Sequence, residues 1–147
     1  MDLPKFHLNL RTPDKTFFDG EVNSVKLETA LGQTEIFSNH APLIGSIGFS
    51  RVIVRAGEHE TDFLIRQGLV FVDALQNTVS MLAYYCEEFA EVDPATIAEY
   101  TKLILEKFKD KKDLNKYQLT FLEDQKVSAE KMLEVVQTHE NSKQQKK

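Results

Sequence analysis

Apolar and polar side chains alternate along the first ninety residues of the chain. Phe6, Leu8 and Leu10 are separated by single polar residues, which is the period of a half-buried strand. Further candidate strands, bounded by turn signals, are the region marked by Val22, Val25 and Leu27 and residues 51–55, 61–66, 69–73 and 78–84. A parallel sheet would need crossover helices, and no helical pattern precedes Asp93. The pattern therefore predicts an antiparallel β-sandwich or barrel.

Spacings of three and four residues replace this alternation after residue 92. Asp93 and Pro94 form a helix start, with an aspartate cap followed by proline at the first helical position. A polar run at residues 109–113, in which Asp113 is a candidate cap, then separates two helical patterns. Their apolar stripes are Ile97, Tyr100, Ile104 and Phe108 in the first, and Leu114, Tyr117, Phe121, Ala129, Met132 and Val136 in the second. Two such helices predict an antiparallel hairpin.

Composition sharpens the division between the two patterns. All six glycines and every arginine lie before residue 69, and residues 93–147 contain neither type. Residues 1–92 carry 7 basic and 13 acidic residues, and residues 93–147 carry 11 and 10, which together give the net charge of −5. Turn formers in one part and helix formers in the other indicate two architectures on one chain. We expect a sandwich over residues 1–90, a hairpin over 91–138 and a disordered, wholly polar tail over 139–147.

The overall balance excludes several classes of protein. The 41% hydrophobic and 28% charged residues are typical of a globular chain, and the net negative charge argues against a nucleic-acid binder. Apolar runs such as residues 81–86 are far shorter than the roughly 20 residues of a membrane-spanning helix. The sequence shows no basic start followed by an apolar stretch, so it predicts no secretory signal peptide. Direct insertion into a membrane is therefore not expected.

Residue types with reactive chemistry are scattered. The four histidines, His7, His40, His59 and His139, do not have the spacing of metal ligands, and no phosphate loop or nucleophile elbow occurs. The single cysteine, Cys86, lies in an apolar run and is interpreted as a buried structural thiol. The sequence thus predicts no catalytic site, no metal and no cofactor.

One polar segment interrupts the strand pattern at residues 38–45. It leads through Asn39, His40 and Pro42 back into apolar residues. The simplest interpretation is a loop that enters a new strand, with His40 bonded to the backbone. The alternative is a surface loop presented to a partner protein.

From this segment a family resemblance emerges. The order and spacing of Phe18-Asp19-Gly20, Gly32, the segment Asn39-His40-Ala41-Pro42-Leu43, Gly68 and residues 79–83 resemble the epsilon subunit of F-type ATP synthases, called delta in mitochondria. The resemblance covers residues 3–92 by motif and 93–138 by architecture. It implies an N-terminal antiparallel β-sandwich of about ten strands, followed by a C-terminal antiparallel two-helix hairpin.

The resemblance also implies a non-catalytic rotor subunit. In this family the sandwich lies at the foot of the central stalk, where it grips the gamma subunit and touches the membrane-embedded ring of c subunits. The hairpin folds down on the sandwich or extends toward the catalytic alpha and beta subunits, and extension inhibits ATP hydrolysis in many bacterial members. The matching residues are Asn39, His40, Ala41 and Pro42 for gamma and Leu31, Gly32 and Gln33 for the ring. Lys126 and Lys131 on the second helix are candidate electrostatic contacts with acidic catalytic subunits, and the alternative is that they belong to a solvated face.

The chain departs from the family pattern at informative positions. Gln33 stands where an acidic residue commonly faces the ring, so the negative charge of that contact is missing here. Some members bind ATP through a hairpin motif that contains an aspartate and an arginine. Asp93 matches the aspartate, but Thr96 replaces the arginine, whose bidentate phosphate contact threonine cannot supply. We therefore expect no useful ATP affinity and a divergent member of the family.

Two alternatives to the usual rotor subunit stay open. One is a stand-alone interaction module whose hairpin captures another partner. The other is an epsilon-like subunit of a specialised rotary ATPase that lacks the usual ring contact. As a rotor subunit, the chain is expected in a peripheral complex on the cytoplasmic face of a bacterial inner membrane, or in a plastid thylakoid.

Overall fold

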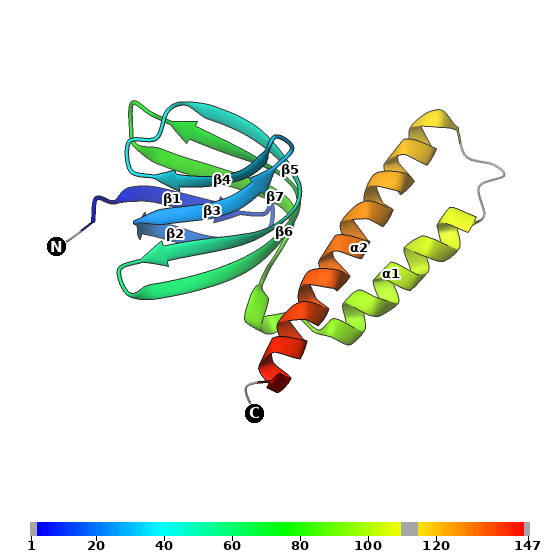
Figure 1. Cartoon of the computed structure of the whole chain (residues 1–147). Coiled ribbons are helices and arrows are strands. Elements are labelled where there is room, and N and C mark those ends of the chain that lie inside the picture. Colours follow the sequence, from blue (N-terminus) through cyan, green and yellow to red (C-terminus); the bar gives the residue numbers. More distant parts are fainter. Residues whose placement is uncertain (1–2, 110–114, 146–147) are drawn as a thin grey trace. The chain divides into compact units, whose positions relative to one another are not determined.

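The computed structural model of the chain describes residues 3–109 and 115–145 (Figure 1). The chain divides into two compact units, Met1–Glu91 and Val92–Lys147. The described strands belong to the first unit and the described α-helices to the second. The sequence predicted the division one residue earlier, after residue 90.

One hydrogen-bonded sheet of seven strands forms the first unit. The strands are β1 (Phe6–Arg11), β2 (Thr16–Val22), β3 (Ser24–Thr29), β4 (Gly32–Phe37), β5 (Leu43–Ala56), β6 (His59–Asp73) and β7 (Thr78–Glu88). Their order is β2-β1-β7-β6-β5-β3-β4, and β1 and β7 form the one parallel pair among them. β2 also contacts β5, although three strands separate them in the sheet, so the sheet folds over on itself (Figure 1).

The core lies between the two layers of the folded sheet. Each of the seven strands contributes buried apolar side chains to a single cluster, as the alternating pattern of β1 and β3 predicts. Phe6, Leu8 and Leu10 of β1 are all fully buried. Burial of this apolar surface is the main stabilising contribution to the fold.

The predicted fold class is confirmed, but the strand count of about ten is wrong. β5 and β6 run for 14 and 15 residues, and β6 continues through Gln67 and Gly68, where the sequence predicted a turn between two strands. Gln67 has a positive φ of 54°, yet the pairing continues in unchanged register on both sides of it, from Arg66 opposite Tyr85 to Gly68 opposite Ala83. The residues Gln67 and Gly68 therefore mark an irregularity within one strand, not a turn between two.

Cys86 is buried in the core near the end of β7. Burial, with a smaller contribution from the Glu87 carboxylate, raises the pKa of its thiol to about 12. A thiol with so little thiolate is a weak nucleophile, which agrees with a structural role.

The last turn of the first unit is anchored to the sheet. A short 3-10 helix, η1 (Phe89–Glu91), follows β7, and its Phe89 side chain is buried. The Arg51 guanidinium lies 4.6 Å from the centre of the Phe89 ring, and its Nε donates a hydrogen bond to Asp62 Oδ2 at 3.0 Å. The chain is thus fixed to the sandwich as far as η1.

Two helices, α1 (Pro94–Lys109) and α2 (Lys116–Gln145), form the second unit. Asp93 caps α1 as predicted, because its Oδ1 accepts a hydrogen bond from the Ala95 amide at 3.0 Å. For α2, the predicted cap Asp113 lies outside the described residues. Asn115 and Gln118 form a reciprocal capping box instead, with side chain to backbone bonds of 2.8 and 3.0 Å.

The helices pack through a mixed apolar and polar interface. Buried apolar residues are Ile97, Ile104, Ala129, Met132 and Val136, as the stripes predicted. Thr101, Gln125 and Ser128 are also buried, and hydrogen bonds cross the interface from Tyr100 Oη to Gln125 Oε1 at 2.8 Å and from Thr101 Oγ1 to the Ala129 carbonyl at 3.3 Å. These bonds satisfy polar groups that would otherwise destabilise the hairpin.

The prediction for the buried stripe of α2 is wrong at two positions. Tyr117 and Phe121, which were expected in the stripe, are 84% and 61% exposed. Counted back from Val136 at spacings of four and three, the stripe passes through Gln125 to the half-buried Leu122, so Phe121 lies at its edge.

The tail predicted to be disordered from residue 139 instead continues α2 to Gln145. No glycine or proline interrupts it, and the hydroxyls of Thr138 and Ser142 donate to carbonyls four residues earlier. Across the described residues, neither helix combines the length and apolar character required to cross a membrane.

Candidate partner-binding surface

The four predicted gamma-contact residues lie in the loop that joins β4 to β5, residues 38–42. Asn39, Ala41 and Pro42 are exposed and His40 is half-buried. His40 Nδ1 donates a hydrogen bond to the Ala41 carbonyl at 2.7 Å, which orients the ring within the loop. The backbone bond expected of His40 as a loop residue is therefore present, and the loop still exposes its polar and apolar groups.

Hydrogen bonds from distant segments fix the start of this loop. Asn39 has a positive φ of 61°, and its backbone N–H donates to Asn77 Oδ1 at 2.7 Å. Asn77 Nδ2 donates to Ser38 Oγ at 3.0 Å and to the Lys5 carbonyl at 3.1 Å. Sequence analysis did not identify Asn77, because its partners are far away along the chain.

The predicted ring-facing residues form the tip between β3 and β4. Leu31 is 93% exposed, and Gly32 has a φ of 121°, which favours glycine. Thr29 stabilises the tip, because its Oγ1 accepts from the Leu31 amide at 3.2 Å and donates to the Gly32 carbonyl at 3.3 Å. Gln33 is exposed beside it, so the tip presents an apolar side chain and an uncharged polar one.

Both loops adjoin the first residues of β5. Residues 38–42 lead directly into Leu43, and the Ala30 amide beside the tip donates to the Ser46 carbonyl at 2.9 Å. The Thr29 side chain also approaches Gly45 closely, since a Cβ on this glycine would lie 3.2 Å from Thr29 Cγ2. The two predicted contact loops are therefore held by one strand.

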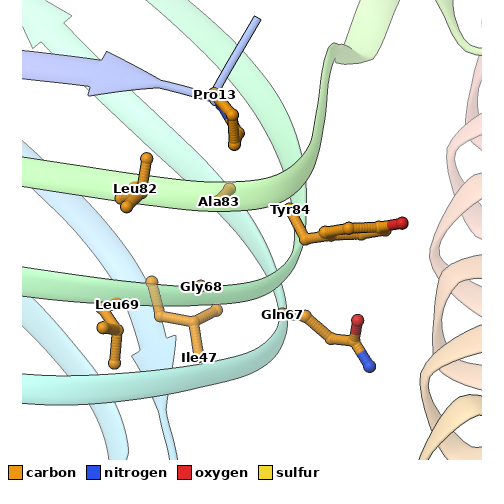
Figure 2. Close-up of a pocket in the computed structure, with 8 residues that line it drawn as sticks. All are labelled: Pro13, Ile47, Gln67, Gly68, Leu69, Leu82, Ala83 and Tyr84. Atoms are coloured by element: carbon orange, nitrogen blue, oxygen red, sulfur yellow. The ribbon is translucent and has the colours of Figure 1, made fainter.

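An apolar outer face lies on the same long strands. The exposed side chains of Ile44, Leu69, Phe71, Leu82 and Tyr84 lie on β5, β6 and β7, and the register pairs Ile44 with Phe71 and Leu69 with Leu82. A groove of about 450 Å³ runs here, lined by Pro13, Ile47, Gln67, Gly68, Leu69, Leu82, Ala83 and Tyr84 (Figure 2). Exposed apolar faces of this kind are typical of protein interfaces.

Sequence analysis missed this outer face. The signal was present in β6, where Leu69 and Phe71 alternate with the buried Val70 and Val72. An uninterrupted apolar run in a strand indicates that both faces are covered, one by the core and the other by something else.

His7, on the exposed side of β1, lies between two carboxylates of β2. Its Nε2 is 2.5 Å from Asp19 Oδ1 and its Nδ1 is 3.4 Å from Glu21 Oε1. The hydrogen bond to Asp19, opposed in part by desolvation and assisted by Glu21, raises the pKa of His7. Within the described part of the chain, no group of three or more His, Cys, Asp and Glu residues has a geometry that could hold a metal ion.

The hairpin candidates do not form one site. Lys126 is half-buried and Lys131 is exposed on α2. Because they are five residues apart, the two side chains leave the helix about 140° apart, so they do not build a common basic face.

The residues that match the nucleotide motif bond to each other. Asp93 Oδ2 accepts a hydrogen bond from Thr96 Oγ1 at 3.1 Å, while Oδ1 caps the helix. Both side chains therefore serve the start of α1.

Comparison with known proteins gives a consistent result. The family model described as ATP synthase, Delta/Epsilon chain, beta-sandwich domain matches residues 5–88. The ATP synthase epsilon chain of Clostridium novyi (strain NT) is 33% identical over 108 residues, which cover 72% of this chain and 80% of that one. The chloroplastic epsilon chain of Huperzia lucidula is 33% identical over 94 residues, 63% of this chain and 67% of that one.

Solved structures share the fold. A chain of the Euglena gracilis mitochondrial ATP synthase matches with a TM-score of 0.72 at 15% identity, covering 92% of this chain and 84% of that one. One from the central stalk and c-ring of the Tetrahymena thermophila enzyme matches with a TM-score of 0.51 at 22% identity, covering 62% and 72%. The match of the whole sandwich to the family model, together with the bacterial relative, shows that this chain belongs to the delta/epsilon chain family of ATP synthases.

Proposed function

We propose that this chain is the epsilon-type subunit of the central stalk of an F-type ATP synthase and joins the gamma subunit to the ring of c subunits. The observation that carries the proposal is the family match over residues 5–88, which spans the sandwich and both candidate contact loops. Related folds come from ATP synthase assemblies, one of them a central stalk and c-ring. The role is that of an accessory subunit, without catalysis of its own.

The surface supports binding to proteins. In the proposed arrangement, residues 38–42 and the neighbouring apolar face of β5, β6 and β7 bind gamma. Apolar side chains such as Ile44 and Phe71 would lose their exposed surface in that contact, which favours association. A sandwich with one continuous core suits this task, because it keeps the loops in fixed positions while the rotor turns.

The tip between β3 and β4 is proposed to face the c ring. Leu31 would supply an apolar contact and Gln33 a hydrogen bond, without the charge that is common at this position in the family. Relatives occur in bacteria and chloroplasts, which is consistent with a peripheral subunit of a membrane complex. We place it at the cytoplasmic face of a bacterial inner membrane or at the thylakoid.

The hairpin is proposed as a regulatory element. It forms its own compact unit with a partly polar interface, and it exposes Leu103, Phe121 and Val127. A separate element of this kind can be stabilised in different positions by different contacts. Contact with alpha and beta subunits in the extended position would slow ATP hydrolysis, with Lys126 and Lys131 as candidate contacts.

ATP itself should not bind to the hairpin with useful affinity. Thr96 lacks the guanidinium that binds phosphate bidentately, and Asp93 is engaged as the cap of α1. Calorimetry with millimolar ATP is expected to give no saturable heat, and a variant carrying Thr96→Arg provides the comparison. Saturable binding by the unchanged chain would contradict the prediction.

The proposed function can be tested by co-purification. An affinity tag on the chain should recover gamma together with alpha and beta subunits from detergent-solubilised membranes of its source. A tagged variant with Ile44→Asp and Phe71→Asp, which places charges on the apolar outer face, should recover far less gamma. Recovery of other proteins without gamma would favour the stand-alone interaction module.

A further inference from the structure

The side chain of Asn77 joins three segments that are distant in the sequence. Its Oδ1 accepts a hydrogen bond from the backbone N–H of Asn39 at 2.7 Å. Its Nδ2 donates to Ser38 Oγ at 3.0 Å and to the Lys5 carbonyl at 3.1 Å. Because an amide N–H only donates and a carbonyl only accepts, these partners fix the orientation of the Asn77 amide. Ser38 Oγ also donates to the Lys5 carbonyl at 3.2 Å, which closes the network.

The turn that contains Asn77 does not require these contacts. Asn77 has a positive φ of 53°, which asparagine tolerates and glycine adopts equally well. Asp73 supports the turn itself, since its Oδ1 accepts from the amides of Leu75 and Gln76 at 3.1 and 3.2 Å. The three bonds of the Asn77 side chain therefore act on residues 38–39 and on the chain just before β1.

We propose that Asn77 is the positioning residue of the partner-binding loop, residues 38–42. It holds Asn39 in its left-handed conformation and so fixes the course of the chain into His40 and Pro42. A loop ordered before binding loses less conformational entropy on binding. The three hydrogen bonds of the Asn77 side chain, here called the clamp, therefore raise affinity without touching the partner. This inference rests on the proposed function, because it takes gamma to be the protein that binds this loop.

The variant that isolates the clamp is Asn77→Gly. Glycine accepts the positive φ, so only the side-chain bonds are lost. The matched control is Gln76→Gly in the same turn, because the exposed Gln76 side chain takes no part in the network. With purified gamma subunit of the same ATP synthase as the probe, calorimetry should show about tenfold weaker binding for Asn77→Gly and little change for Gln76→Gly.

A double-mutant cycle with His40→Ala distinguishes positioning from general weakening of the fold. If Asn77 acts through the loop, Asn77→Gly should weaken binding by about twofold or less once His40 is already alanine. Additive effects, or wild-type affinity of Asn77→Gly, would overturn the proposal.

Hydrogen exchange tests the clamp in the free chain. The backbone amide hydrogen of Asn39 should exchange at least about tenfold faster in Asn77→Gly, while backbone amides in the core, such as that of Val70, keep their protection. Should the unchanged chain fail to bind gamma, the proposed function fails, and faster exchange at Asn39 would still support the clamp. Unchanged exchange at Asn39 would overturn it.

Discussion

Replacing Gly68 by valine should destabilise the sandwich by about 3 kcal/mol, the upper part of the range for overpacked cores. Gly68 lies in β6 opposite Ile47 of β5 and Ala83 of β7. A Cβ at this position would lie only 2.8 Å from the Leu82 carbonyl oxygen and 3.3 Å from Ala83 Cα. Backbone atoms cannot move aside as a flexible side chain can, so β6 and β7 would have to separate beside the groove.

The single cysteine gives a specific measurement for this variant. Cys86 is buried in the sandwich, so its reaction with a thiol reagent in increasing urea reports unfolding of that unit. The urea midpoint should fall by roughly 1–3 M in Gly68→Val. The control is Gly48→Ala, because a Cβ on Gly48 meets no atom within 4 Å and the midpoint should hardly change. Equal midpoints for Gly68→Val and the unchanged chain would refute the steric explanation.

Removing residues 92–147 should raise ATP hydrolysis by the assembled complex about fivefold, at the lower end of typical allosteric couplings. The core of the sandwich is drawn from residues between Phe6 and Cys86, and Phe89 is anchored within the first unit, so the truncated chain keeps its core. It should also keep the urea midpoint of Cys86 labelling and its place in the complex. The increase would therefore report loss of the hairpin alone.

A shorter truncation after Thr138 is the control for the hairpin. It removes the polar end of α2 but keeps Ala129, Met132 and Val136, the buried residues of the helix interface. Hydrolysis should then stay near the level of the unchanged complex. If the full truncation leaves hydrolysis unchanged under every nucleotide condition, the hairpin does not slow this enzyme.

Local signals predicted much of the fold. The alternation in β1 and the Asp93-Pro94 start of α1 depend on neighbours in the sequence, and both elements form as expected. Gln67 and Gly68 led to a wrong prediction of a turn. The residue types that accept a positive φ within a long strand are the same ones that form turns. Whether such a pair ends a strand depends on the strands beside it, which no local pattern contains.

The candidate surface was predicted only where a motif marked it. Residues 38–42 and the tip at Leu31 stood out through a resemblance of contiguous residues. Asn77 did not, because its amide bonds to partners 38, 39 and 72 positions away. The apolar outer face was equally hidden, since Leu69 and Phe71 look like core residues until the register places them on the outer side.

We propose that residues 38–42 face gamma and that the tip at Leu31 faces the c ring in an assembled ATP synthase. Site-specific photocrosslinking in the intact complex can test this arrangement, with a photoreactive amino acid placed singly at positions 31, 40 and 58. Glu58 is the control, because it is exposed in the turn between β5 and β6, at the other end of β5. We predict adducts with gamma from position 40, adducts with the c subunit from position 31, and neither from position 58. An intact complex in which position 40 gives no gamma adduct, or in which position 58 gives one instead, would show that residues 38–42 do not face gamma.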